Sequence, residues 1–270
     1  MTSNADNLLS TAPGFCAAEA LSLGVGDGTA PEALVSVDSA PLHPGASPET
    51  VPMAALTSPH DILTHMDEIN EWLVRADPAL ERVIAQSTLD WDQFVKGPFE
   101  ALAGAVLGQR VRYVKARAMR AAFYERLGGV IFTPDALANL VADHGACTVI
   151  GLDDVQVRLF RDLCAYATAR ATPLATAADL RAAADSVKGI GRWTTEAAVV
   201  TALLDSDAFP VGDRWLARKM GLLYGLPRAP DMAQVEALSH RWSPHRAVAA
   251  AYLWRWFDGA EKSQIAAADA

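Results

Sequence analysis

The chain has 270 residues, a formal net charge of −9, and 51% hydrophobic against 20% charged residues. This composition can bury a core and predicts one or two folded domains. The longest segment without a charged side chain, residues 7–18, is too short and too polar to span a bilayer, which argues against a membrane protein.

Cysteine usage and the first residues indicate the compartment. The three cysteines, Cys16, Cys147 and Cys164, are widely spaced and predict neither a disulfide framework nor a four-cysteine metal site. Residues 1–6 carry no basic side chain, so a secretory signal is not expected. We therefore expect a reduced, cytoplasmic setting, close to the nucleoid if the protein is bacterial.

The first 57 residues differ from the rest in charge. They hold six acidic residues and no Lys or Arg, and they are rich in Ala, Ser, Gly and Pro. We predict a disordered acidic leader over residues 1–57; a small β element around residues 33–37 is the alternative. The other 213 residues carry 23 basic and 26 acidic side chains, so the folded part is nearly neutral.

From Pro59 onward the pattern is helical. Ser58 before Pro59 predicts a helix start. Apolar side chains at helical spacing follow in two stripes, Ile62, Met66, Ile69 and Leu73, then Phe99, Leu102, Val106 and Leu107. Further helix starts are predicted at Thr133, at Asp153, and at Thr176, which forms a capping box with Asp179.

The C-terminal part continues the helical pattern. Apolar residues repeat at Ala197, Val200 and Leu204. Ser243 and Pro244 are expected to open a last helix with Ala247, Ala250, Trp254 and Phe257 on one side. Alternating strand patterns are almost absent, so the predicted fold class is all-α.

The segment over residues 187–194 joins two predicted helices through a tight turn with two glycines, Gly189 and Gly191. Glycine permits the sharp turn and a close approach of another backbone. Amide N–H groups at the start of the next helix suit a phosphate. This helix-hairpin-helix pattern is typical of proteins that bind a nucleic-acid backbone without reading its sequence; an ordinary helix–helix corner is the alternative.

An aspartate, Asp213, follows this turn in a loop that holds Pro210 and Gly212. Three other stretches accompany it, residues 98–109, residues 192–194, and residues 241–246 with Trp254. On these residues, between about Asp77 and Asp258, the chain resembles the helix-hairpin-helix base-excision DNA glycosylases. It is most similar to their 3-methyladenine DNA glycosylase II (alkylpurine) branch.

The resemblance implies two helical subdomains that flank a cleft. One covers residues 100–206 and ends in the hairpin; the other combines residues 58–99 with 207–258 and carries Asp213, expected at the mouth of the cleft. Residues 259–270 are expected to form a flexible tail. The implied reaction is hydrolysis of the N-glycosidic bond of an alkylated purine, of the 3-methyladenine or 7-methylguanine type. The implied partner is double-stranded DNA with damaged bases, bound by a monomer.

Departures from the superfamily narrow the implied chemistry. Trp193 stands where lyase-active members have a lysine, which implies a monofunctional enzyme. No cysteine follows Cys164, so an iron–sulfur cluster is not expected. Residues 1–57 are too short and too polar for the extra β domain of many members. The chemistry needs no cofactor and no metal, while a monovalent cation at the hairpin is implied.

Asp213 is the expected catalytic residue. An alkylated purine carries positive charge and leaves readily, so one carboxylate can stabilise the oxocarbenium-like sugar and orient or deprotonate water. The alternative is that Asp213 only caps a helix. Arg246 is expected to tie the Asp213 loop in place by an ion pair, or else to lie solvated at the surface.

A flipped cationic base favours an aromatic pocket. Trp193, Trp215 and Trp254 match pocket positions of the family, with core packing as the alternative. The remaining tryptophans are assigned to packing: Trp72, Trp91, Trp242 and Trp256.

DNA binding is expected at the hairpin, through Lys188, Gly189, Ile190, Gly191, Arg192 and Thr194. Base flipping leaves a gap in the duplex. We expect Arg110 to fill it, with Gln109 facing the orphaned base; the alternative for Arg110 is a phosphate contact. The nearly neutral charge of residues 58–270 predicts a shallow dependence of DNA affinity on salt.

Two other functions stay open at this point. One is a non-catalytic module that recognises damaged DNA with the same hairpin. The other is a glycosylase for uncharged lesions, such as deaminated or etheno bases.

Overall fold

In the computed structural model, the described residues are 58–87, 89, 91, 95–111, 113–129 and 132–257. The expected acidic leader, its alternative β element and the expected tail over residues 259–270 lie outside them. Within the described ranges every regular element is a helix and none is a strand. The all-α fold class is therefore confirmed.

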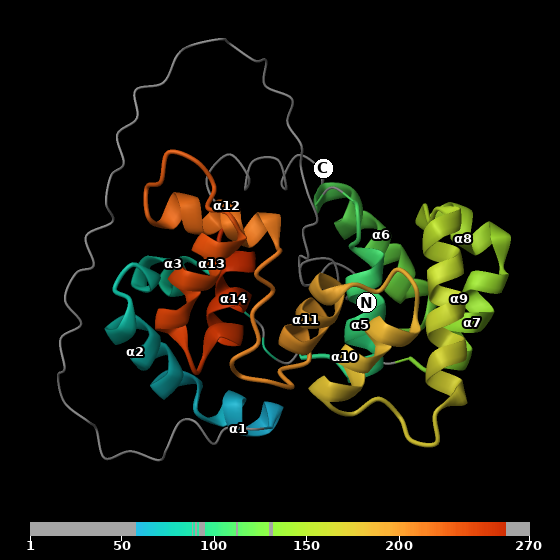
Figure 1. The fold of residues 1–270 in the computed structure, drawn as a ribbon. Coiled ribbons are helices and arrows are strands. Elements are labelled where there is room, and N and C mark those ends of the chain that lie inside the picture. The colour runs from blue at the N-terminus through green and yellow to red at the C-terminus, as the bar shows by residue number, and fades with distance from the viewer. Residues whose placement is uncertain are drawn as a thin grey trace, which may run out of the picture.

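The helices gather in two groups that lie side by side (Figure 1). One group combines helices from both ends of the described chain: α1 (Pro59–Thr64), α2 (Met66–Ala76), α3 (Leu80–Gln86), α12 (Arg214–Leu223), α13 (Met232–Ser239), the 3₁₀ helix η2 (His240–Trp242) and α14 (Arg246–Arg255). The other group is continuous in sequence: α5 (Pro98–Leu107), α6 (Tyr113–Arg126), α7 (Pro134–Ala142), α8 (His144–Ile150), α9 (Asp154–Ala169), α10 (Ala177–Ser186) and α11 (Arg192–Thr201). The exact subdomain boundaries stay a prediction.

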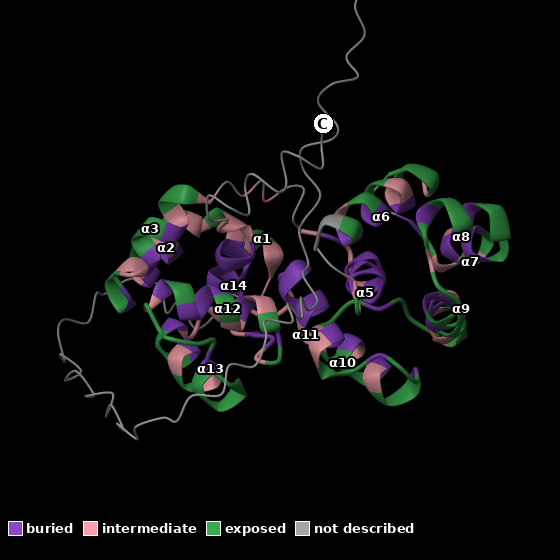
Figure 2. Ribbon diagram, turned by 90° about the horizontal axis from the view of Figure 1, so that it is seen from above, coloured by how far each residue is buried: buried purple, intermediate pink, exposed green. Residues whose placement is uncertain are grey.

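Three helices, α5, α11 and α14, lie innermost (Figure 2). Most of their residues are buried, including the small side chains that surround each helix. Helix α5 is apolar on nearly all sides, and α11 and α14 hold small or apolar residues over 197–200 and 247–254, so these stretches have to be covered on all sides. Helix α11 packs against α5 and α10 in its own group and against α14 in the other. It therefore joins the two groups at the place where the hairpin ends.

Four of the predicted helix starts are present as hydrogen-bonded caps. Ser58 Oγ accepts from the backbone N–H of Asp61 at 3.1 Å. Thr133 Oγ1 accepts from the backbone N–H of Ala136 at 3.2 Å. Asp153 and Thr176 each form a capping box, with Gln156 and Asp179 respectively. Each cap satisfies amide groups that the helix leaves free and contributes about 1 kcal/mol.

Two predicted helices have different bounds in the structure. The stripe from Ile62 to Leu73 is divided, because α1 ends at Thr64 and His65 adopts a non-helical conformation before α2 begins. Its backbone N–H donates to the carbonyl oxygen of Asp61 at 3.2 Å, and its ring Nδ1 lies 2.8 Å from the same oxygen.

The last helix begins at Arg246 and not at Ser243. The preceding residues form a 3₁₀ turn in which the N–H of Ser243 donates to the carbonyl of His240 at 3.1 Å. Phe257, expected on this helix, lies beyond its end at Arg255. Both differences concern helix ends, where local hydrogen bonds decide over apolar periodicity.

Candidate active site

The hairpin occupies the turn between α10 and α11. Gly189 has a φ of 104°, a left-handed conformation that requires glycine. At Gly191 neither the backbone conformation nor a close neighbour requires glycine. Its φ is −100°, and a Cβ at this position would meet nothing within 4 Å. Gly191 is exposed, so the space in front of it is open to another backbone.

The hairpin residues divide into buried anchors and exposed contacts. Ile190 is 3% exposed and inserts into the core, and Thr194 is buried as well. Lys188 and Arg192 are exposed. Gly191, at the N-cap of α11, has no side chain that could accept from the first amides of the helix. Of the predicted DNA-binding residues, Ile190 and Thr194 therefore offer only their backbones.

The predicted wedge residues lie beside the hairpin. Gln109 Nε2 donates to the Gly189 carbonyl at 3.2 Å and to Thr194 Oγ1 at 2.6 Å. This ties the end of α5 to the turn, and it leaves only the amide oxygen of Gln109 for another partner. Arg110 is exposed and has a φ of 59°, a conformation that costs a non-glycine residue on the order of 1–3 kcal/mol.

Wedge and hairpin share one cavity. A cavity of about 490 Å³ is lined by Gln109 and Arg110 together with Lys188 and Gly189. These residues are far apart in the sequence, and the fold brings them to one surface.

Asp213 lies at the N-cap of α12 and joins three helices. Its Oδ1 accepts from the backbone N–H groups of Trp215 at 2.8 Å and Leu216 at 3.0 Å. Its Oδ2 accepts from the indole Nε1–H groups of Trp193 at 3.0 Å and Trp254 at 3.3 Å. The capping interpretation is correct for Oδ1, while Oδ2 is held by side chains of α11 and α14.

The environment of Asp213 changes its protonation. The residue is 1% exposed. Burial raises the pKa of Asp213 to about 6, because a charged carboxylate is costly in an apolar surrounding. The four N–H donors act in the opposite direction and lower this pKa, but burial is the larger cause. A carboxylate with this pKa is ionised at neutral pH and basic enough to accept a proton from a reacting water.

The three predicted pocket tryptophans have different surroundings. Trp193 on α11 is half-buried and Trp254 on α14 is buried, and both indoles point at the same carboxylate oxygen. Trp215 on α12 is half-buried, and its ring lies near cations on its own helix, with Lys219 Nζ 4.5 Å and Arg218 Cζ 5.2 Å from its centroid.

Arg246 binds the loop that leads to Asp213. Its guanidinium donates to both carboxylate oxygens of Asp207, at 2.9 and 3.0 Å, and to Glu236 at 3.2 Å. The ion pair thus forms six residues before Asp213 and not with Asp213 itself. The N–H of Ala247 also donates to the carbonyl of Ser206 at 2.9 Å.

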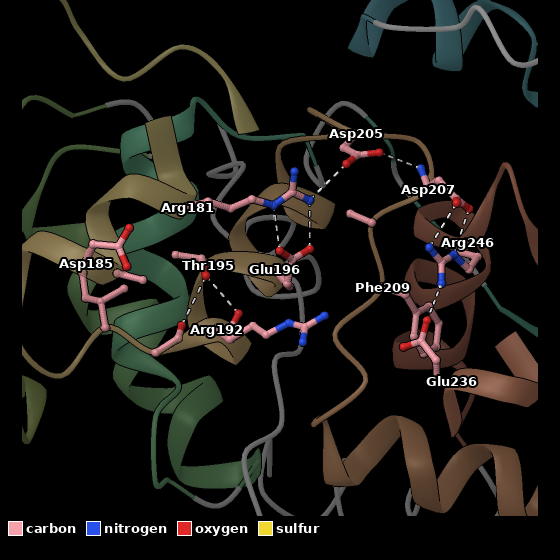
Figure 3. Close-up of a pocket in the computed structure, with 14 residues that line it drawn as sticks. Arg181, Asp185, Arg192, Thr195, Glu196, Asp205, Asp207, Phe209, Glu236 and Arg246 are labelled. Atoms are coloured by element: carbon pink, nitrogen blue, oxygen red, sulfur yellow. Dashed lines mark hydrogen bonds and ion pairs between the residues drawn. The ribbon is translucent and has the colours of Figure 1, made fainter. Parts of the chain in front are cut away.

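The same loop is bound from the other helix group by Arg181 on α10. Arg181 donates to Glu196 at 2.8 Å and to Asp205 at 3.0 Å (Figure 3). Both ion-pair clusters line a cleft of about 810 Å³ beside Gly191 and Arg192. Sequence analysis did not find Asp205, Asp207 or Arg181, because charged residues of this kind are common on any surface and no local pattern pairs them.

The structure encloses Asp213 more than the sequence indicates. We expected its carboxylate at the mouth of a cleft, but Asp213 lines neither of the two cavities described above. The reason is that the indoles of Trp193 and Trp254 cover Oδ2. Among the described residues, no group of three His, Cys, Asp or Glu side chains could hold a metal ion. None of the described helices is long and apolar enough to cross a membrane.

Comparison with known proteins identifies similar sequences. No family model matches the chain. The chain is 36% identical over 69 residues to DNA-3-methyladenine glycosylase 1 of Schizosaccharomyces pombe, which covers 26% of this chain and 30% of that protein. It is 25% identical over 177 residues to the DNA-3-methyladenine glycosylase of Bacillus subtilis, covering 58% of this chain and 56% of that one. The chain thus spans less than two thirds of the curated relatives it matches.

A solved structure extends the likeness to the fold. The 3-methyladenine DNA glycosylase of S. pombe, determined in complex with abasic DNA, superposes with a TM-score of 0.59 at 22% identity. The superposition covers 69% of this chain and 95% of that one. The chain therefore has the fold of the helix-hairpin-helix DNA glycosylases, and the two proteins similar to it in sequence that are named above are 3-methyladenine DNA glycosylases.

Proposed function

We propose that the protein is a monofunctional DNA glycosylase that hydrolyses the N-glycosidic bond of alkylated purines in duplex DNA. The observation that carries this proposal is the Asp213 carboxylate. It is buried, has a pKa raised to about 6, and among the described residues it accepts hydrogen bonds from neutral N–H donors on helices α11, α12 and α14. The same helix α11 begins at the hairpin, so a protein that grips DNA at the turn holds the carboxylate at a fixed place relative to it.

The hairpin supplies the grip on the phosphate backbone. The uncapped first turn of α11 offers amide N–H groups, and the open space at Gly191 lets a phosphate approach them. Lys188 and Arg192 add positive charge at the same exposed surface. Arg110 is the side chain that enters the duplex when a base is flipped out, a role supported by its position beside the hairpin in the cavity that it lines with Lys188 and Gly189.

The chemistry follows from charge. An alkylated purine leaves as a neutral base, so the enzyme has to stabilise the positive sugar that remains. The ionised carboxylate of Asp213 provides the negative charge, and its basicity allows it to take the proton of the attacking water.

The two indoles hold Oδ2 in position. An indole donates but cannot accept, so it stabilises the ionised form without competing for the proton. An indole also has no amine for a Schiff base, so Trp193 in place of a lysine supports hydrolysis without strand cleavage.

The test uses duplex DNA treated with a methylating agent, with the released bases separated by chromatography. We expect the protein to release methylated purines and to leave alkali-sensitive sites without cutting the strand itself. Asp213→Asn should lower this release at least a hundredfold. The matched control is Asp231→Asn, the same change at the N-cap of α13, and it should keep near-normal release.

Other outcomes decide between the remaining functions. Tight binding to methylated DNA with no base released would favour the non-catalytic module. Cleavage of the strand without alkali would show a lyase and contradict the monofunctional assignment.

A further inference from the structure

Lys219 is a buried lysine that the chemistry above does not use. It lies on α12, six residues after Asp213, and its side chain is fully buried. Its Nζ lies 4.5 Å from the ring centroid of Trp215, 5.5 Å from that of Phe257 and 5.7 Å from that of Trp256. Three aromatic rings thus surround one ammonium group and replace part of the water that it loses on burial.

The rings of Trp215, Trp256 and Phe257 form a cage around Lys219, and one of them, Trp215, is expected to contact the substrate. Trp215 is half-buried, and its backbone N–H donates to Asp213, so this residue connects the cage to the carboxylate. A ring that already interacts with an ammonium attracts a second cation less, because the two positive charges repel each other through a poorly screened interior.

Arg218 provides an internal comparison on the same helix. Its guanidinium carbon lies 5.2 Å from the same ring, at nearly the distance of Lys219. Arg218 is exposed, however, so water and salt screen its charge. Of the two cations near Trp215, the buried one has the larger effect on what the ring binds.

We propose that Lys219 is a specificity-determining residue that acts through Trp215 and lowers the preference of the site for positively charged bases over neutral bases of similar size. This inference rests on the proposed function and on Trp215 lining the base pocket. In this proposal Lys219 acts on the base through the ring of Trp215, so it is a positioning residue and not a catalytic one.

The experiment measures a ratio of excision rates. Two duplexes of the same sequence carry either 7-methylguanine, which is positively charged, or hypoxanthine, which is neutral, and single-turnover release is measured for both. In Lys219→Met, which keeps an unbranched apolar side chain without the charge, the ratio of charged to neutral release should rise about fivefold over the wild type. Lys219→Arg should restore the wild-type ratio, and the control Arg218→Met should change it less than about twofold.

A structural role for Lys219 would give a different result. Loss of packing alone lowers both rates together and leaves the ratio unchanged. In addition, Lys219→Met introduced into a Trp215→Leu background should leave the ratio of that background unchanged, because the ring that transmits the charge is absent. Folding of each variant is checked by thermal unfolding, and Lys219→Gln replaces Lys219→Met if the latter does not fold.

The outcomes separate the two proposals. A wild-type protein that releases neither base overturns the proposed function and this inference with it. A wild-type protein that releases 7-methylguanine but no measurable hypoxanthine supports the proposed function and overturns the inference. The same holds if the ratio is unchanged when the charge at position 219 is removed.

Discussion

Two buried aspartates, Asp213 and Asp77, are built from similar parts and differ in what surrounds them. Each accepts a hydrogen bond from a tryptophan indole, Asp213 from Trp193 and Asp77 from Trp242 at 2.9 Å. Each also accepts from backbone N–H groups at the start of a helix. Both are almost inaccessible, with 1% of Asp213 and 4% of Asp77 exposed.

The difference lies in the remaining partners. Asp77 also accepts from the Tyr224 hydroxyl at 2.5 Å and lies 3.9 Å from the guanidinium of Arg241. These contacts join the turn between α2 and α3 to the end of α12 and to η2. Among the described residues, the hydrogen-bond donors to Asp213 are neutral N–H groups, and burial raises its pKa. The comparison teaches that similar donors can serve two ends: around Asp77 they link helices, and around Asp213 they leave a carboxylate whose charge stays costly, which suits chemistry.

The largest expected effect is on activity. Asp213→Asn should reduce base release by about 10² to 10⁴-fold, the range for removing an acid–base group. Asp77→Asn should keep release within a few-fold of the wild type once the protein is folded, because Asp77 contacts no part of the candidate site. Single-turnover release from methylated duplex measures both variants. Equal losses in the two variants would remove the distinction between the two aspartates.

The same two variants should differ in how their stability changes with pH. The folded-state pKa of Asp213, about 6, lies above the unfolded value of 3.8, so the folded protein binds this proton more tightly. The corresponding stabilisation is present below about pH 4 and is lost as the pH rises through 6, a change of about 3 kcal/mol. An asparagine cannot ionise, so Asp213→Asn should gain stability relative to the wild type over this window.

In both variants the amide nitrogen leaves buried donors without an acceptor, a loss of about 2 kcal/mol, so the pH-dependent gain is what distinguishes Asp213→Asn from Asp77→Asn. Denaturant unfolding at pH 4, 5, 6 and 7 measures both changes. A stability difference between Asp213→Asn and the wild type that does not vary with pH would contradict the ionisation argument.

The indole N–H donors to the two aspartates allow a further comparison. Trp193→Phe keeps a ring but removes one N–H donor from Oδ2, so the pKa of Asp213 should rise. The acidic limb of the pH–rate profile should then move to higher pH by roughly one unit, equivalent to about 1.4 kcal/mol. Trp242→Phe removes the indole donor from Asp77 and should lower stability without moving the profile. A profile that shifts equally in both variants would show that the donors act through global stability.

Part of the fold and of the candidate site could be predicted from the sequence alone. Helix starts at Thr133, Asp153 and Thr176 were predictable because a cap is decided by residues three positions apart. The similarity to glycosylases was predictable from short motifs, and so was the all-α fold from the missing alternation of strands. The residues that these motifs single out, Asp213 with Trp193 and Trp254, do meet in the structure.

What the sequence could not provide was the set of partners at each position. The sequence leaves Asp213 open as a catalyst or a helix cap, and the structure shows that Oδ1 accepts from the first amides of α12 while Oδ2 accepts from two indoles. Trp242 was assigned to packing, yet its indole also donates to Asp77, 165 residues away. Pairings over such distances depend on the packing of whole helices, which no local spacing encodes.

The smallest expected effect concerns the cation beside Asp77. The Arg241 side chain is 46% exposed, and its nitrogen lies 3.9 Å from Asp77 Oδ2, a distance and exposure at which an ion pair contributes at most about 1 kcal/mol. Arg241→Met should therefore lower the free energy of unfolding by less than about 1 kcal/mol, and less still at high salt, with base release unchanged. Denaturant unfolding at low and high salt measures it. A loss as large as that of Asp77→Asn would mean that the cation is essential to this buried acid.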